Sequence, residues 1–332
     1  MVTTRHYGMD WLRIGAFALL ILYHIGMYFV PWGWHVKTPH PMDWVQIPMM
    51  ATNSWRLPLL FLVSGYASAA LFAKLGGAGA FLRSRSARLL IPLAFGIIVV
   101  IPVQPWIELA TQHGYAHGFG YFWVHDYFRF GTLDGIVLPT WQHLWFVVYL
   151  FAYTLLAVAA LVLVPERART KIADGAALIG WLLRERPVLF ESVARCWPAA
   201  AALAVAAYGY IVWAMWSAPD EGPAPAGIVT IFMVVRLVQG WATIVALIGI
   251  ADRFANRDHP RRAMLAEAVF PFYIVHQTII VVVGWWLLQG QVAALPAFLI
   301  LVAATVVGCW AFYLGGRRIG WLRPLIGLQR RA

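Results

Sequence analysis

Charged residues and cysteines are both scarce in this chain of 332 residues. Asp, Glu, Lys and Arg make up 12% of the sequence, against roughly 25% in an ordinary soluble domain. With 62% hydrophobic residues, a water-soluble protein would need an implausibly large apolar core. A bilayer removes that difficulty, so the composition favours a membrane protein. The two cysteines, Cys196 and Cys309, indicate neither a disulfide framework nor a thiolate metal site.

Acidic residues are the scarcest charged group, since 14 Asp and Glu stand against 25 Lys and Arg. In a soluble protein a net charge of +11 would suggest nucleic acid as a partner. Here 21 of the 25 basic residues fall in the termini and in every second loop between apolar runs. This distribution is typical of cytoplasmic loops. It predicts that both termini are cytoplasmic and that nucleic acid is not a partner.

Long apolar runs are what the chain has in abundance. A helix needs about 20 apolar residues to cross about 30 Å of hydrocarbon. The expected spans are 11–31, 55–74, 89–107, 143–164, 197–217, 227–250, 268–288 and 294–315. The predicted fold is therefore an all-α, polytopic membrane bundle with eight clear spans, forming a single domain over residues 1–332. Loops 32–54, 108–142, 218–226 and 289–293 are expected outside the cytoplasm.

Ionisable side chains inside spans are costly, which makes each of them a functional candidate. His24 lies well inside the first expected span, with Asp10 and Arg13 near its cytoplasmic end. Eleven positions bring Arg13 and His24 to one helical face, about 16 Å apart along the axis. They could contact two parts of one elongated ligand, while Asp10 can pair with Arg13. His24 is either a general base, which requires neutral imidazole, or a polar residue satisfied by a neighbouring helix.

A second cluster, Arg83, Arg85 and Arg88, comes just before the third expected span. Topology alone accounts for basic residues in a cytoplasmic loop. The functional alternative is a phosphate site, because guanidinium groups bind phosphate oxygens in bidentate fashion. Three of them suit a highly anionic group such as the nucleotide end of coenzyme A.

His276 lies in the seventh expected span, at a depth that would allow contact with His24. Glu267, at the inner end of that span, and Arg236 are weaker candidates and are expected to be ion-pair partners. Further polar residues gather around the large outer loop: Glu108, His113, His117, His125, Asp126 and His143. Their spacing matches no compact ligand pattern, so we expect a solvated polar surface or an acceptor pocket there rather than a metal site.

Several of these residues belong to segments that resemble the acyltransferase 3 family of bacterial membrane O-acyltransferases. The resembling segments are Asp10-x-x-Arg13 with His24, Phe61–Tyr66, Arg85-x-x-Arg88, His143–Phe146 and Tyr273–His276. Two further segments, Trp55–Phe61 and Phe270–Thr278, are similar to the glucan-modifying branch of that family. The segments are spread over most of the chain, and their order is more specific than any one of them.

The resemblance implies an enzyme of the bacterial inner membrane that transfers an acyl group, acetyl or succinyl, from acyl-CoA to a hydroxyl of an envelope glycan or glucan. Acyl-CoA would be a substrate, with no permanently bound cofactor, and membrane lipids would surround the bundle. The resemblance also implies that His24 and Arg13 form the essential motif and that Arg85 and Arg88 bind the donor. Family members commonly have about ten spans; the two further spans either lie around 121–129 and 172–183 or are absent from this chain.

Two mechanisms are compatible with these residues. Neutral His24 would take the proton of the acceptor hydroxyl as it attacks the thioester, or His24 would itself carry the acyl group transiently. A transporter or flippase for an anionic lipid or sugar is the alternative function. It predicts internal symmetry and matching broken helices, which the sequence does not show.

Overall fold

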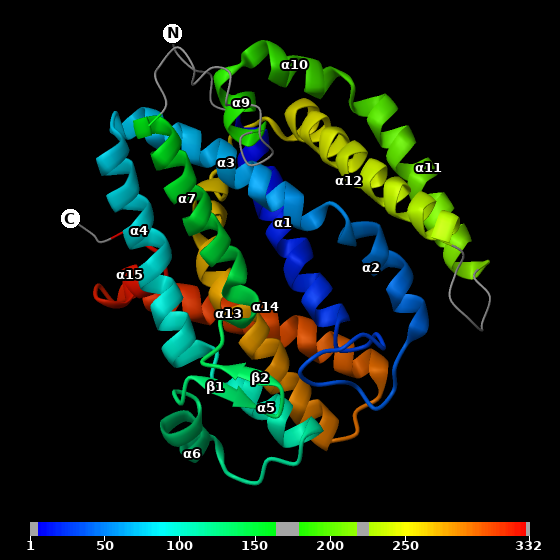
Figure 1. The fold of residues 1–332 in the computed structure, drawn as a ribbon, viewed down its shortest axis with the longest axis vertical. Coiled ribbons are helices and arrows are strands. Elements are labelled where there is room, and N and C mark those ends of the chain that lie inside the picture. The colour runs from blue at the N-terminus through cyan, green and yellow to red at the C-terminus, as the bar shows by residue number, and fades with distance from the viewer. Residues whose placement is uncertain (1–5, 164–178, 218–225, 330–332) are drawn as a thin grey trace. The chain divides into compact units, whose positions relative to one another are not determined.

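The computed structural model describes residues 6–163, 179–217 and 226–329, and Figure 1 traces their fold. The longer helices are α1 (Tyr7–Gly26), α3 (Arg56–Leu75), α4 (Ala78–Phe95), α7 (Trp145–Leu163), α11 (Trp197–Trp216), α12 (Ala226–Ala255), α13 (Arg262–Gln289) and α14 (Ala294–Arg318). The shorter ones are α2 (Gln46–Asn53), α5 (Val103–Gln112), α6 (Phe119–Tyr121), α9 (Ile179–Glu185), α10 (Pro187–Arg195) and α15 (Leu322–Leu325). Two strands, β1 (Gly131–Leu133) and β2 (Ile136–Leu138), pair antiparallel with Thr132 opposite Val137.

Eight helical segments of the described chain are long and apolar enough to cross a membrane. They cover Tyr7–Gly26, Asp43–Leu75, Ala78–Gln112, Gln142–Leu163, Trp197–Trp216, Gly227–Ala255, Arg262–Gln289 and Ala294–Arg318. The prediction of an all-α membrane bundle with eight spans is therefore confirmed. The cytoplasmic placement of the termini stays a prediction.

The bounds of the first three spans differ from those predicted. The first helix ends at Gly26 instead of residue 31, because the next amides close tight turns: Phe29 N–H donates to the Gly26 carbonyl at 2.9 Å. The second segment starts at Asp43, inside an expected loop. The third starts at Ala78, so the arginine cluster lies within helix α4 and not before it. Hydropathy alone misses such helical ends, since Arg, Ala and Leu are good helix formers in a polar stretch.

The outer loop predicted at 108–142 is partly structured. Helix α5 runs to Gln112, and residues 122–126 form a single π-helical turn after α6. The strand pair follows, so residues 121–129 do not form a further span. Of the region 172–183, residues 172–178 lie outside the described chain. Six of the basic residues that predict the orientation also lie outside it: Arg5, Arg167, Arg169, Lys171, Arg330 and Arg331. The part that is described begins the short helix α9.

The chain divides into two compact units. The first unit comprises Met1–Phe17, Gln46–Lys74 and Pro165–Ala266; the second comprises Ala18–Val45, Leu75–Val164 and Glu267–Ala332. Helices α1 and α13 therefore contribute one end to each unit. The prediction of a single domain over residues 1–332 stays a prediction.

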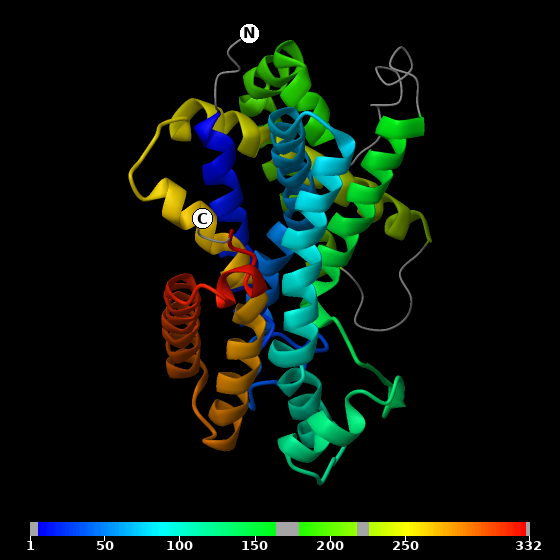
Figure 2. The ribbon, with the colours of Figure 1, turned by 90° about the vertical axis from the view of Figure 1, so that its left-hand side faces the viewer.

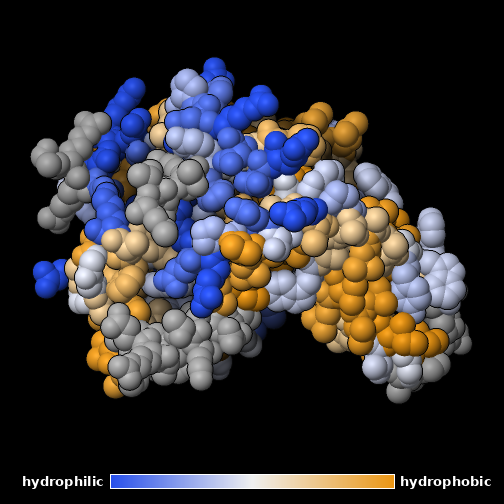
Figure 3. Space-filling view, turned by 90° about the horizontal axis from the view of Figure 1, so that it is seen from above, coloured by the Kyte–Doolittle hydropathy of each residue, from blue (hydrophilic) through white to orange (hydrophobic). Residues whose placement is uncertain are grey.

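In the first unit, α11 and α12 pack along each other. A Cβ on Gly8 of α1 would come within 2.5 Å of the Ala251 carbonyl oxygen of α12, so this glycine permits close helix contact. Figure 3 shows mainly hydrophobic side chains over the α11–α12 part. Val205 of α11 is 72% exposed and Leu237 of α12 is 65% exposed. Such side chains are stable in lipid and not in water.

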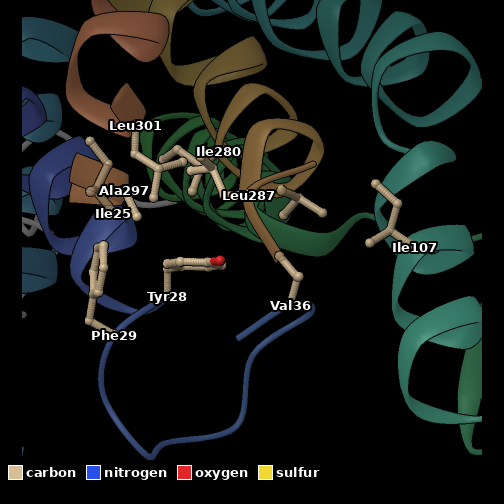
Figure 4. Packing of buried hydrophobic residues seen from close by; sticks show 10 residues of the cluster. Ile25, Tyr28, Phe29, Val36, Ile107, Ile280, Leu287, Ala297 and Leu301 are labelled. Atoms are coloured by element: carbon tan, nitrogen blue, oxygen red, sulfur yellow. The ribbon is translucent and has the colours of Figure 1, made fainter. Parts of the chain in front are cut away.

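In the second unit, α4 and α7 lie side by side, as Figure 2 shows. A buried cluster joins the end of α1 to α13 and α14 (Figure 4). Tyr28 and Phe29 pack there with Ile280 of α13 and Leu301 of α14. This cluster begins one residue after His24 and one helical turn after His276, so it fixes the end of α1 and the middle of α13, which carry these two histidines.

Candidate active site

The two intramembrane histidines of the second unit contact each other. His24 Nδ1 lies 2.7 Å from His276 Nε2, and the two rings are nearly parallel with their centroids 5.0 Å apart. His276 is fully buried, whereas His24 is half-buried. The contact that their similar depth allows is therefore present, between residues 252 positions apart.

The hydrogen bonds of His276 determine which nitrogen of His24 carries a proton. His276 Nδ1 lies 2.8 Å from the Tyr273 carbonyl oxygen and 3.2 Å from that of Phe272. Carbonyl oxygens only accept, so Nδ1 must be the protonated nitrogen, and Nε2 of a neutral His276 is an acceptor. His24 then donates through Nδ1–H, which leaves its lone pair on Nε2.

His143 is the third histidine of this group. Its Nε2 lies 3.1 Å from the carbonyl oxygens of both Tyr273 and Ile274, and its ring meets that of His276 edge-on at 5.2 Å. The Tyr273 hydroxyl donates to the His143 carbonyl. His143 is only 6% exposed, so of the two environments expected for it, a solvated surface and an acceptor pocket, the solvated surface does not apply. Its burial was not expected because His143 opens a span, at the end of the polar loop.

The loop after α1 covers the histidine pair. Trp34 stacks on His24 with ring centroids 5.5 Å apart and planes 24° from parallel. The next residue, His35, is hydrogen-bonded through Nδ1 to the carboxylate of Glu108. Sequence reasoning did not single out Trp34 or His35, because neither lies within an expected span.

Glu108 belongs to a buried polar network and not to a solvated surface. His35 Nε2 lies 3.0 Å from Gln277 Nε2, which also donates to Gln104 Oε1 at 3.0 Å. Gln104 donates in turn to Thr278 at 2.6 Å. Gln277 directly follows His276, so this network holds the segment of α13 that positions the histidine pair.

The other candidates of the outer loop have contacts of their own, separate from His24, His276 and His143. His113, His117 and His125 are exposed. Tyr121 stacks on His117 and packs at a tilt against His125. Asp126 accepts a hydrogen bond from Tyr115 and pairs with Arg129 at 3.1 Å. In residues 6–163, 179–217 and 226–329, no three His, Cys, Asp or Glu side chains gather to hold a metal ion.

The arginine cluster of α4 also belongs to the second unit. Arg85 Nε donates to the hydroxyl of Thr154 on α7 at 3.4 Å, while Arg83 and Arg88 are exposed. No carboxylate among the described residues lies within ion-pair distance of Arg85 or Arg88. Two neighbouring guanidinium groups without acidic partners, inside a segment long enough to span the membrane, form a site suited to an anion.

Asp10 and Arg13 lie in the first unit. Asp10 forms an ion pair with Arg262 at 2.6 Å, and Arg262 forms a second ion pair with Asp258 at 2.8 Å. Arg13 Nη2 donates to the Ala266 carbonyl at 3.3 Å. These contacts fasten the start of α1 to the start of α13. Glu267 pairs with Arg317 at 3.3 Å in the second unit, as expected of an ion-pair partner.

A pair of imidazoles, oriented by backbone carbonyls, can move a proton at His24 Nε2, and two arginines suited to an anion lie in the same unit. A pair of imidazoles oriented in this way is suited to general acid–base chemistry. A family model described as an acyltransferase domain matches residues 6–173, slightly more than half of the chain. The chain belongs to this acyltransferase family, which confirms the resemblance found in its sequence.

Relatives with a named role support the same branch. The chain is similar to glucans biosynthesis protein C of Escherichia coli O6:K15:H31 (strain 536 / UPEC), with 27% identity over 154 residues. The same protein of Escherichia coli O1:K1 / APEC and of O139:H28 (strain E24377A / ETEC) matches equally. Each match covers 46% of this chain and 38% of the relative. No solved structure matches the chain.

Proposed function

We propose that this membrane acyltransferase transfers an acetyl or succinyl group from cytoplasmic acyl-CoA to a hydroxyl of an envelope or periplasmic glucan. The observation that carries the proposal is the 2.7 Å contact between His24 Nδ1 and His276 Nε2. A contact of this polarity makes Nε2 of His24 the basic nitrogen. The enzyme would lie in the bacterial inner membrane, where both acyl-CoA and the acceptor can be reached.

In the proposed reaction His24 acts as general base. Its Nε2 takes the hydroxyl proton of the acceptor while the hydroxyl oxygen attacks the thioester carbon. The resulting tetrahedral intermediate collapses by breaking the carbon–sulfur bond. Protonated His24 then returns the proton to the departing thiolate. His276 stabilises the imidazolium of His24 through the hydrogen bond on the opposite nitrogen, in the manner of the third member of a catalytic triad.

The donor end of the site would be formed by the arginines of α4. Phosphates of coenzyme A would bind Arg85 and Arg88, with Arg83 at the rim, because guanidinium forks match phosphate oxygens. Arg85 is already oriented by Thr154, which lowers the cost of ordering it. Asp10 and Arg13 are proposed to support the site through the fixed start of α1.

The glucan acceptor is inferred from the relatives named above. Their name associates them with glucans, and the match covers 38% of their length. The aromatic and polar residues of the outer loop, such as Tyr121 and His117, suit a sugar, which stacks its apolar face on aromatic rings and hydrogen-bonds through its hydroxyls.

The test is release of coenzyme A by purified protein in nanodiscs. Acetyl-CoA and succinyl-CoA are supplied separately, with and without a crude envelope glycan extract. We expect glycan-dependent release by the wild type and none by His24→Ala, with His113→Ala as an exposed histidine control. Release that is unchanged in His24→Ala would refute the role of His24. No release with either donor by folded wild-type protein would refute the proposed donors and favour the transporter alternative.

A further inference from the structure

One polar atom beside the histidine pair has no partner. The indole nitrogen of Trp34 is shielded from solvent, and no acceptor lies within hydrogen-bond distance of it in the described residues. An indole N–H can only donate, and buried donors are almost always paired. Each exception therefore needs an explanation, such as a catalytic role or an acceptor supplied by a bound molecule.

The position of Trp34 indicates which bound molecule is relevant. Its ring stacks on His24, the proposed base, with 5.5 Å between centroids. Because the two rings stack, a molecule that binds at His24 also lies beside this indole. The thioester of the acyl donor must come to the same place for the acceptor hydroxyl to attack it, and its carbonyl oxygen becomes negatively charged during the reaction.

The backbone around Trp34 is held from two sides. Gln112 of α5 donates from Nε2 to the Trp34 carbonyl at 2.7 Å and to the His35 carbonyl at 2.9 Å. Lys37 donates from Nζ to the carbonyls of three residues that precede Trp34: Met27, Val30 and Trp32. These bonds fix the backbone that carries Trp34, and its ring is held by stacking on His24. Preorganised donors are the ones that stabilise developing charge most effectively.

We propose that Trp34 is a catalytic residue that donates its indole N–H to the acyl carbonyl oxygen as the tetrahedral intermediate forms. The inference rests on the proposed function. As the acceptor oxygen bonds to the carbonyl carbon, the carbonyl π electrons move to its oxygen, and the hydroxyl proton goes to His24 Nε2. The oxyanion is then bound by Trp34 until the electrons return and the carbon–sulfur bond breaks, when the proton of His24 passes to sulfur.

A packing role for the ring makes a different prediction from a donor role. If Trp34 only covers His24, removal of the N–H with retention of the ring leaves catalysis unchanged. If it binds the oxyanion, loss of the N–H lowers kcat and leaves the donor KM unchanged, because the bond forms only in the transition state. Removal of one such donor typically costs about 100-fold in kcat.

The experiment therefore replaces Trp34 by benzothienylalanine, which has the same bicyclic shape with sulfur in place of N–H. Trp34→Phe serves as a second variant, and Trp44→Phe, at a side chain that is 66% exposed, is the matched control. Thermal unfolding in nanodiscs checks that each variant is folded. Steady-state kinetics follow coenzyme A release from acetyl-CoA and succinyl-CoA with the glycan extract.

We expect kcat to fall about 100-fold in the benzothienylalanine variant, with unchanged donor KM, unchanged unfolding temperature and an unaffected Trp44→Phe control. Wild-type kcat in that variant would overturn the role of Trp34. The proposed function would still stand in that case, provided that His24→Ala is inactive in the same assay. If wild-type protein releases no coenzyme A from either donor, the proposed function fails and the role of Trp34 fails with it.

Discussion

His276 is predicted to act on catalysis through the tautomer of His24. Replacing it by Phe removes the acceptor of the His24 Nδ1–H bond, which spans 2.7 Å. A donor left unpaired at a buried site costs about 1–3 kcal/mol, and about 1.4 kcal/mol corresponds to a factor of ten in rate. Without this acceptor, neutral His24 can also carry its proton on Nε2, and in that tautomer Nε2 has no lone pair to act as a base. We therefore expect kcat to fall about 10- to 100-fold.

A second variant separates orientation from packing. His276→Gln places a side-chain carbonyl where it can accept the same hydrogen bond, so it should recover part of the kcat lost in His276→Phe. Both variants should leave the donor KM close to that of the wild type, because the arginine site is untouched. The assay is coenzyme A release with saturating donor and glycan extract, after thermal unfolding has shown that the variants are folded. Wild-type kcat in His276→Phe, together with an inactive His24→Ala, would refute this reasoning.

Three other predictions concern donor binding, pH and helix contact. Arg85→Ala and Arg88→Ala should each raise the donor KM about tenfold or more, from the loss of a charge-assisted bond, and an unchanged KM would contradict donor binding there. Burial lowers the pKa of Lys37 from 10.5 to about 8. Between these values the unfolded chain binds the extra proton, so the unfolding temperature of the wild type should rise relative to Lys37→Met as pH increases from about 8 to 10; a constant difference would contradict the shift. Gly8→Ala should lower the unfolding temperature because its Cβ would meet backbone, whereas Gly15→Ala, with open space around it, should not.

The spans could be predicted because they depend on a local property. About 20 apolar residues in sequence are enough to cross a bilayer as a helix, and eight such runs were found. Their ends could not be predicted equally well. The start of α4 is a polar helical stretch that carries Arg83 and Arg85, and hydropathy does not distinguish such a stretch from a loop.

Part of the candidate site could also be found from the sequence. His24 and His276 attract notice because an ionisable residue in a span is costly, and similar depth allowed contact between them. Trp34 and His35 gave no such signal, since they lie in the loop after α1, whose path depends on Lys37 and Gln112. The burial of His143 could not be predicted, because burial at the start of a span is set by packing against α13, which one sequence does not reveal.

The division of α1 between two units bears on the shared face of Arg13 and His24. The helical period puts both residues on one side of α1, but their partners belong to different units: Ala266 for Arg13 and His276 for His24. The proposed chemistry therefore depends on the second unit, with Asp10 and Arg13 in a supporting role. Activity lost in Arg13→Ala should accordingly be accompanied by a lower unfolding temperature.

The central claim, acyl transfer to a glucan hydroxyl with His24 as base, is tested most directly by following the acyl group itself. Isotope-labelled acetyl-CoA or succinyl-CoA is incubated with a purified glucan and the protein in nanodiscs. The mass of the glucan is then measured by mass spectrometry. We predict that the wild type adds the labelled acyl mass to the glucan and that folded His24→Ala adds none. Equal labelling by both proteins, or an unmodified glucan with either donor, would contradict the account.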